Sequence, residues 1–313
     1  MAKIKIAVIT TGGTIAMRDE GRGGVPALGP DELLAHLPAD LRQQARVDVE
    51  AFSNVPSSHF TLNHVWQLRK AVVDRLGRLY VRGAVITHGT DTMEETAYLL
   101  DVTVPGERPV VLTGAMFRAD EAGYDGFRNV ADALRVALDP GAWGRGAMIV
   151  MNGEVHAARY AVKVKSHGAD AFASPGRGPM GRIIGDRVHW YWNVERDVIP
   201  VREIEPDVYL LKATLGAPDT LLRALVQQRP RGIVIEGFGG GRVPPGWMEP
   251  IREAVQQGTV VVVASRCPAG HTGDEYGYAG ACRDLEAAGV VLAGELNGLK
   301  ARLKLMAALG QRE

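Results

Sequence analysis

The chain has 313 residues, of which 46% are apolar and 23% charged. This is ordinary globular composition, so a disordered chain is excluded, and the length favours two domains over one. The 36 Lys and Arg residues balance the 36 Asp and Glu residues. A net charge of zero gives no electrostatic reason to bind phosphate backbones or anionic lipid, so neither nucleic acid nor a membrane is expected as a partner.

The N-terminal segment does not resemble a secretory signal. Its first nine residues are interrupted by Lys3 and Lys5, and no later run approaches 18 uncharged apolar residues. A cytoplasmic location is therefore expected. The two cysteines, Cys267 and Cys282, are too few for a disulfide scaffold and have no metal-ligand spacing, so no metal site is predicted.

Short apolar runs alternate with helix-period segments, which is typical of β-α-β units in a mostly parallel sheet. The first part is predicted to contain strands at 4–9, 47–52, 84–87, 109–113 and 147–151, and helices that begin at 30 and cover 61–76, 93–100 and 126–138. From 151 to 192 this rhythm breaks, and an antiparallel strand is expected at 187–193.

The charged, proline-flanked residues 195–206 have linker composition, and β-α cycles resume after them. The sequence therefore predicts an N-terminal α/β domain at 1–194, a linker at 195–206 and a smaller C-terminal α/β domain at 207–313. The expected elements of the second domain are strands at 208–211, 232–235, 259–264 and 290–292, and helices at 220–228, 247–256 and 299–309.

Two polar stretches directly follow predicted strands: Thr10-Thr-Gly-Gly-Thr-Ile-Ala16 and Thr87-His-Gly-Thr-Asp-Thr-Met-Glu-Glu-Thr-Ala97. Ligands of open α/β sheets bind beyond the carboxyl ends of the strands, so these stretches are the first candidates for a site. A threonine hydroxyl becomes a nucleophile only when a neighbour takes its proton, and Lys163 could be such a partner. Taken singly, the paired glycines could serve only a turn, and Thr90-Asp91 only a helix N-cap.

Together, the two stretches resemble the signature segments of the bacterial-type L-asparaginases. The resemblance continues through Asn54-Val-Pro-Ser-Ser58, Pro109-Val-Val-Leu-Thr-Gly-Ala-Met116, Val150-Met-Asn152 and Lys300-Ala-Arg302. It implies a larger flavodoxin-like domain with a mostly parallel sheet, a smaller α/β domain, and active sites between the subunits of a homodimer, usually within a homotetramer. It implies no metal and no organic cofactor.

The resemblance also implies roles for individual residues. Thr14 matches the nucleophile, and Thr90, Asp91 and Lys163 match a second catalytic group. Ser57 matches a residue that holds the substrate's α-carboxylate, and Asp91 also receives the α-amino group. The substrate-binding set that it implies is Gly13, Ser57, Ser58, Gly89 and Asp91.

Lys163 and Lys165 are both near the position of the family's lysine. Residues two apart on an extended strand point the same way, so side-chain alternation does not choose between them. The register of the resemblance, from Val150-Met-Asn152 to Phe172, places Lys163 on that position.

The chain departs from the family pattern in the substrate loop and in the segment after the first motif. Ser58 stands where the family often has Gln, and residues 17–28 contain no Tyr, the usual activator of the first threonine; the nearest Tyr along the chain is Tyr80. This polar segment, with three glycines, is expected to be a mobile lid. Glu275 is a weak candidate for an acid supplied across the dimer.

The expected activity is hydrolysis of L-asparagine to L-aspartate and ammonia through an acyl ester on Thr14. One alternative is a glutaminase-asparaginase of broader specificity, because one methylene in a pocket is worth only about 1 to 3 kcal/mol. The other is a non-catalytic amino-acid-binding homologue, which the missing lid tyrosine suggests. His88 lies within the second signature and is expected to be structural.

Overall fold

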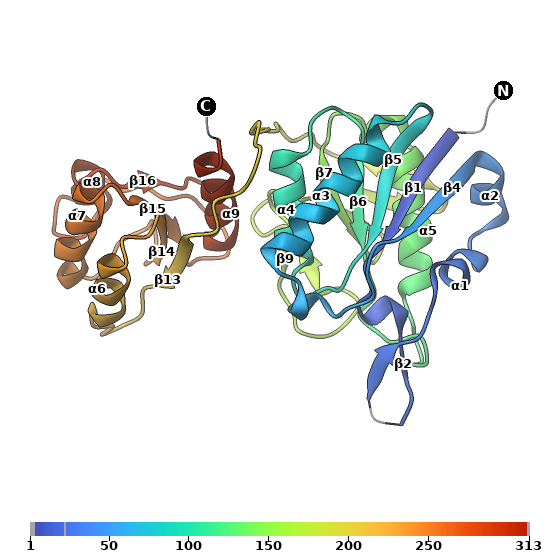
Figure 1. The fold of residues 1–313 in the computed structure, drawn as a ribbon, viewed down its shortest axis with the longest axis horizontal. Helices are drawn as coiled ribbons and strands as arrows, with labels where there is room; N and C mark the ends of the chain where they lie inside the picture. Colours follow the sequence, from blue (N-terminus) through green and yellow to red (C-terminus); the bar gives the residue numbers. More distant parts are fainter. Residues whose placement is uncertain (1–3, 22, 312–313) are drawn as a thin grey trace. The chain divides into compact units, whose positions relative to one another are not determined.

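The computed structural model describes residues 4–21 and 23–311. The chain divides between Val198 and Ile199 into two compact units, here called unit 1 and unit 2 (Figure 1). Each unit contains a mostly or wholly parallel sheet with helices packed against it, which confirms the predicted α/β class.

Unit 1 is built on an eight-stranded sheet with the order β12-β11-β8-β7-β6-β5-β1-β4. Its strands are β1 (Ile4–Thr10), β4 (Ala45–Ala51), β5 (Val81–Thr87), β6 (Val110–Thr113), β7 (Ala147–Met151), β8 (Glu154–Ala157), β11 (Gly181–Ile184) and β12 (Arg187–Trp190). The five strands from β7 to β4 are parallel, whereas β8, β11 and β12 pair antiparallel. The antiparallel strand expected at 187–193 is therefore β12, which ends at Trp190.

Helices cover both faces of this sheet (Figure 1). One face carries α1 (Pro30–Ala35), α2 (Ala39–Gln44) and α5 (Gly126–Leu138), and the other carries α3 (Leu62–Gly77) and α4 (Met93–Thr103). Thr61 caps α3 as expected, because its side chain accepts the backbone N–H of His64. Two buried apolar clusters, one on each face, fix the central strands between the helices.

The strand order reverses between β1 and β5. From β1 the chain passes through α1 and α2 to β4 on one side, and it then crosses through α3 on the other face to β5. Such a switch point leaves a crevice at the carboxyl ends of the two strands, where α/β proteins bind ligands. Both sequence motifs begin at these ends, so the topology brings them together.

The structure contains short elements that the sequence did not predict. In the segment expected to be a loop, β2 (Met17–Asp19) and β3 (Gly24–Pro26) pair antiparallel as a hairpin. A second small ladder pairs β9 (Val162–Lys163) with β10 (Phe172–Ala173). Two- and three-residue strands are too short to show alternation, which is why composition alone suggested a loop.

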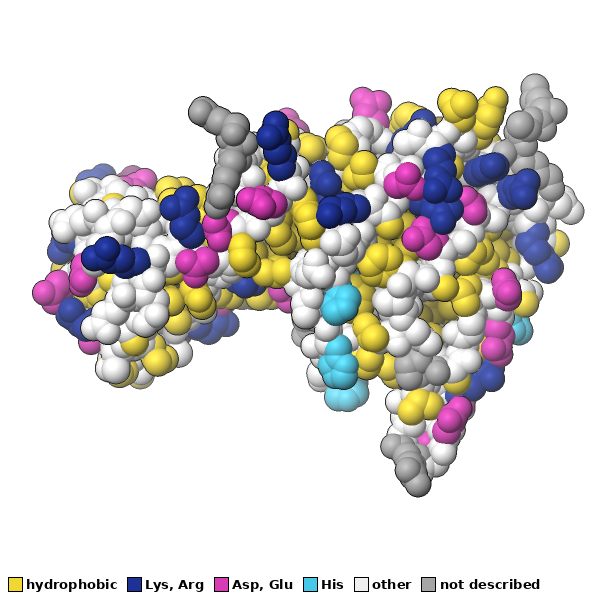
Figure 2. Space-filling view, in the orientation of Figure 1, with side chains coloured by type: hydrophobic (Ala, Val, Ile, Leu, Met, Phe, Trp, Pro, Cys, Tyr) yellow, Lys and Arg dark blue, Asp and Glu magenta, His cyan; other side chains and the backbone are white. Residues whose placement is uncertain are grey.

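Unit 2 has a parallel four-stranded sheet with the order β13-β14-β15-β16. Its elements are β13 (Val208–Lys212), β14 (Gly232–Gly237), β15 (Val260–Ser265), β16 (Val291–Leu292), α6 (Thr220–Gln227), α7 (Met248–Gln256), α8 (Cys282–Ala287) and α9 (Gly298–Leu309). The six-residue helix α8 was not predicted. Figure 2 shows acidic and basic side chains interspersed over the visible face, in keeping with the zero net charge.

The start of the segment 195–206 is firmly attached to unit 1. The Arg196 guanidinium donates to the Asp101 carboxylate at 3.2 Å, to the carbonyl of Gly106 beyond α4, and to the carbonyls of Asp101 and Val104 at the end of α4. These carbonyls lie where a helix has no further N–H groups of its own to satisfy them. Arg196 therefore acts as a side-chain cap for α4.

Candidate active site

Three segments meet at the switch point, and the two glycines where they meet have no room for a side chain. Gly13 lies against Gly89, since a Cβ on Gly13 would stand 2.4 Å from the Gly89 Cα. Gly89 in turn lies against Ser57, whose Oγ would be 2.6 Å from a Cβ on Gly89. Gly13 also has a φ of 88°, which strongly favours glycine. The first motif, the second motif and the substrate loop therefore pack directly against one another.

Thr11 ties these segments together from the first motif. Its N–H and its hydroxyl both donate to the carbonyl of Thr87, at 3.1 and 2.9 Å. Its own carbonyl accepts from the N–H of Val55 and the hydroxyl of Ser53. Thr11 is 1% exposed, so these bonds are shielded from water.

The substrate loop is bonded to the second motif through Ser57. The Ser57 Oγ accepts the backbone N–H of Asp91 at 3.2 Å, and the hydroxyl of Thr92 donates to the Ser57 carbonyl at 3.0 Å. Ser57 is buried, whereas the following Ser58 is exposed. Of the two predicted substrate-loop residues, the structure brings only Ser57 into contact with the second motif.

Lys163 joins the second motif from the β9–β10 ladder. Its Nζ donates to the Thr90 Oγ1 at 2.9 Å and to the Asp91 Oδ1 at 2.6 Å. Its backbone N–H donates to the Glu94 carboxylate at 3.2 Å, which anchors the strand to the first turn of α4. The predicted group of Thr90, Asp91 and Lys163 is thus assembled in the structure.

The neighbouring lysine has a different environment. Lys165 lies beyond the end of β9 and pairs with Asp170 at the surface. Its side chain is 54% exposed, compared with 16% for Lys163. The two lysines therefore do not share one strand face, as an extended strand through both would require.

Thr14 begins the turn that follows the glycines. The short 3-10 helix Thr14–Ala16 starts at this residue, which is half-buried, while Ile15 and Ala16 are buried in the apolar cluster below it. Because Gly13 abuts Gly89, Thr14 and Thr90 each lie one residue beyond that contact. The candidate acid Glu275 is an exposed residue of unit 2.

His88 supports the second motif from beneath. Its Nδ1–H donates to the Gly89 carbonyl at 2.7 Å, which leaves Nε2 as the acceptor of the Thr96 hydroxyl at 3.1 Å. Complete burial lowers the pKa of His88 to about 4, so the ring is neutral near pH 7. Its contacts agree with the expected structural role.

Tyr124 is a nearby residue that the sequence analysis missed. It lies just before α5, and its hydroxyl donates to the carbonyl of Ile15 at 2.6 Å. The two residues are 109 positions apart in the sequence. The hairpin has no tyrosine of its own, but the turn before it is contacted by the phenol of Tyr124. No local pattern could have shown this contact.

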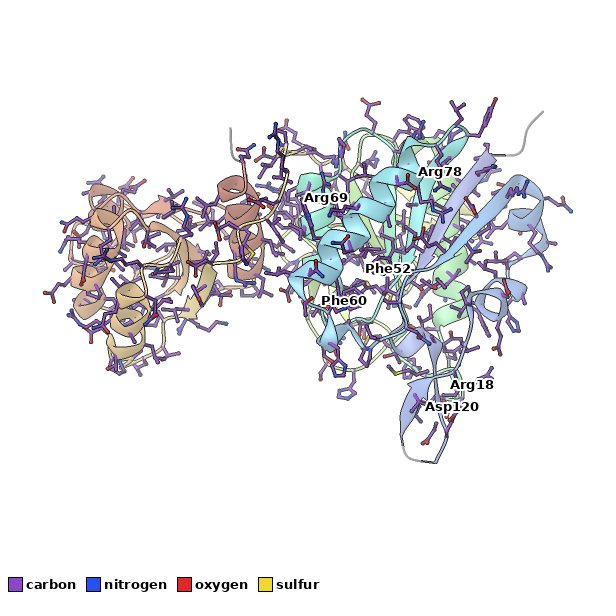
Figure 3. The ribbon with its side chains drawn as sticks, viewed as in Figure 1. Arg18, Phe52, Phe60, Arg69, Arg78 and Asp120 are labelled. Carbon is purple, nitrogen blue, oxygen red and sulfur yellow. The ribbon has the colours of Figure 1, made fainter. Side chains whose placement is uncertain are left out.

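Ion pairs join strand β2 of the hairpin to neighbouring segments. Arg18 pairs with Glu32 of α1, and Arg118 lies 3.9 Å from Asp19 and 3.3 Å from Asp120. Figure 3 labels Arg18 and Asp120 beside this hairpin. The segment expected to be a lid therefore has its own strand pairing and charged contacts.

Within residues 4–21 and 23–311, no group of three or more His, Cys, Asp or Glu side chains is arranged to hold a metal ion. In the same part of the chain, none of the helices is both long enough and apolar enough to cross a membrane.

Comparison with known proteins assigns the family. Residues 5–196 match the model of the N-terminal asparaginase domain, and residues 207–313 match that of the glutaminase/asparaginase C-terminal domain. The chain is 38% identical to the L-asparaginase of Bacillus licheniformis, over 96% of this chain and 94% of that protein. It is 36% identical to a probable periplasmic L-asparaginase of Haemophilus influenzae, over 98% and 88%.

The fold agrees with this assignment. The crystal structure of a probable cytoplasmic L-asparaginase from Campylobacter jejuni superposes with a TM-score of 0.87 at 33% identity, covering 99% of this chain and 96% of that one. The chain is an α/β protein of the asparaginase class. It belongs to the bacterial-type L-asparaginase family.

Proposed function

We propose that the protein hydrolyses the side-chain amide of L-asparagine to L-aspartate and ammonia. The observation that carries this proposal is the cluster of Lys163, Thr90 and Asp91, joined by bonds of 2.9 and 2.6 Å, one residue from the contact between Gly13 and Gly89. Thr14, which heads its own turn, directly follows Gly13, and Thr90 directly follows Gly89, which supports a role for both threonines in one reaction. Family membership supports the same activity.

In the first half-reaction, the Thr14 Oγ attacks the amide carbon of the substrate and forms a tetrahedral intermediate. Backbone N–H groups near Gly13 and Thr90 stabilise the oxyanion, a contribution of about 3 to 4 kcal/mol in comparable sites. The C–N bond then breaks, the leaving nitrogen takes the proton that the Thr14 hydroxyl gave up and departs as ammonia, and an ester remains on Thr14.

In the second half-reaction, a water molecule attacks this ester and releases aspartate with a free Thr14 hydroxyl. In both halves, proton transfer to and from Thr14 falls to water or to the Lys163, Thr90 and Asp91 group. The Lys163 Nζ already donates to the Thr90 hydroxyl, so Thr90 can pass its own proton on and recover one from Lys163. Asp91 balances the positive charge that Lys163 carries.

The polar ends of the substrate are held by the residues around this group. Ser57 presents its hydroxyl beside the first turn of α4, where the helix N-terminus favours a carboxylate. The Asp91 carboxylate is 65% exposed and remains accessible to an ammonium group. Gly13 and Gly89 allow the substrate to approach the backbone closely. The exposed Ser58 lies next to Ser57 in the substrate loop.

The test is an ammonia-release assay with L-asparagine and L-glutamine, with the Thr14→Ala variant as control. Turnover of asparagine that is lost in Thr14→Ala supports the proposal. Equal kcat/KM values for both amides would favour a glutaminase-asparaginase, an alternative that the description of the C-terminal family domain suggests. Binding of aspartate without any turnover would instead indicate a non-catalytic homologue.

We also propose that the protein works in the cytoplasm as a homo-oligomer, a dimer or a dimer of dimers. The likeness to a probable cytoplasmic enzyme supports the location, although a similar relative is described as periplasmic. Cell fractionation tests the location, and light scattering at assay concentration tests the assembly. A fully active monomer would refute the second point.

A further inference from the structure

The turn that presents Thr14 is held at each of its three carbonyl groups. The Thr14 carbonyl accepts the N–H of Met17, and the Ala16 carbonyl accepts those of Ala27 and Leu28 at 2.7 and 2.9 Å. The Ile15 carbonyl, between them, accepts the Tyr124 hydroxyl at 2.6 Å. The middle of the turn is thus held by a side chain from a distant segment.

Tyr124 is itself fixed by its surroundings. Its ring packs edge-on against Phe127, with the centroids 4.8 Å apart and the planes at 89°, and Phe127 stacks on His36 at 3.9 Å. Its hydroxyl lies directly over Gly126, where a Cβ would stand 2.2 Å from the oxygen. The position of the phenol therefore depends on Gly126 having no side chain.

The chemistry of this phenol suits a permanent donor. Burial raises the pKa of the Tyr124 hydroxyl, and the charge of the adjacent Asp125 raises it further. The group therefore stays protonated across the working pH range. A neutral phenol that donates to a carbonyl orients that carbonyl but does not remove a proton from Thr14.

We propose that Tyr124 is a positioning residue for the nucleophile: its hydrogen bond to the Ile15 carbonyl fixes the turn that carries Thr14. The hairpin has no tyrosine to offer, and Tyr124 supplies a phenol to this turn by another route. This inference rests on the proposed function of Thr14.

The test compares Tyr124→Phe with two other variants. Tyr124→Phe removes only the hydroxyl and keeps the ring on Phe127. Gly126→Ala keeps the hydroxyl but displaces it, and alanine at the first position of α5 favours the helix, so loss of folding is not expected. Tyr98→Phe is the control, because the Tyr98 hydroxyl is buried and has no hydrogen-bond partner among the residues that the structure describes.

We expect kcat to fall about three- to tenfold in Tyr124→Phe and in Gly126→Ala, because one neutral hydrogen bond is worth about that factor. KM and the affinity for L-aspartate should stay unchanged. The double variant should be no slower than the slower single variant, because both changes remove the same bond. The rate at which an electrophilic asparagine analogue labels Thr14, followed by mass spectrometry, should fall in parallel. Tyr98→Phe should keep the wild-type values.

Two results would overturn the inference. One is a Tyr124→Phe enzyme with wild-type kcat and labelling rate. The other is a loss of aspartate affinity equal to the loss of kcat, which would indicate general disruption of the pocket. The Thr14→Ala variant separates this inference from the proposed function. If Thr14→Ala remains active, Thr14 is not the nucleophile. If Thr14→Ala is inactive while Tyr124→Phe has wild-type kcat, only the positioning role of Tyr124 fails.

Discussion

Lys163 donates a 2.9 Å hydrogen bond to Thr90 across 73 positions of sequence. The bond depends on the two-residue strand β9, whose partner β10 holds Phe172 opposite Lys163. The short ladder therefore selects which of two nearby lysines reaches the second motif.

Replacing this lysine separates the two candidates. We expect Lys163→Ala to lower kcat about 100-fold or more, the usual effect of removing a proton-transfer group. Lys165→Ala is the matched control, because it breaks only an exposed ion pair with Asp170, and it should stay within twofold of wild type. Steady-state ammonia release measures both, and an active Lys163→Ala enzyme would contradict the assignment.

Gly13→Ala tests the close approach of the two motifs. The new Cβ would meet the Gly89 backbone at 2.4 Å, and backbone atoms cannot rotate away as a side chain can. We expect kcat/KM to fall at least 100-fold, since a displacement of about 1 Å at a reacting group has that effect.

The control for this change is Gly21→Ala in the hairpin. Gly21 has a φ of 87°, almost the same as Gly13, but apart from its chain neighbours no described residue lies within 4 Å of its added Cβ. Both variants carry the backbone strain of about 1 to 3 kcal/mol, and only Gly13→Ala carries the clash. Equal kcat/KM values in the two variants would show that the contact between Gly13 and Gly89 is not required for activity.

His88 should make the stability of unit 1 depend on pH. Its folded pKa of about 4 lies below the ordinary value of 6.5, so the unfolded chain binds more protons between these values. The free energy of unfolding should therefore fall as the pH drops from 6.5 to 4, by up to about 3 kcal/mol over the whole window.

Urea denaturation at several pH values measures this dependence. His88→Gln can still donate to the Gly89 carbonyl and accept from Thr96, but it does not titrate, so its curve should be flatter than that of wild type in this window. Parallel curves for the two proteins would rule out His88 as the source.

Arg196→Ala should destabilise unit 1. The substitution leaves the Asp101 carboxylate buried without Arg196, although the Ala147 N–H still donates to this carboxylate. It also removes the donor from the carbonyls at the end of α4. Breaking a buried pair in this way costs about 3 to 5 kcal/mol. Arg202→Ala, an exposed position in the same segment, is the control for chemical denaturation, and equal stabilities would exclude the capping role.

The regular part of the fold could be read from the sequence because its signals are local. The buried runs that form β5 and β6, and the capped helix after Thr61, carry their periodicity within a few residues. The same holds for both glycine motifs, whose position after strands already indicated the crevice. The short helices α2 and α8 and the β2–β3 hairpin were missed, because six residues or fewer give too little pattern.

The missed part of the candidate site is non-local. The bond from Tyr124 to Ile15 depends on how α5 packs against the turn, and nothing near either residue in the sequence indicates the other. The choice of Lys163 over Lys165 was available only from the register of the family resemblance. Side-chain contacts that span two layers of the fold require the tertiary structure.

The interlock of Gly13, Gly89 and Ser57 also bears on how the protein acquires activity during folding. These residues follow β1, β5 and β4, and they meet only when β1 has paired with both neighbours, so no single motif can form the site alone. Pairings between strands distant in sequence form slowly, because loop closure precedes their contacts. During refolding from urea, catalytic activity should therefore return after most of the helical circular dichroism signal has recovered.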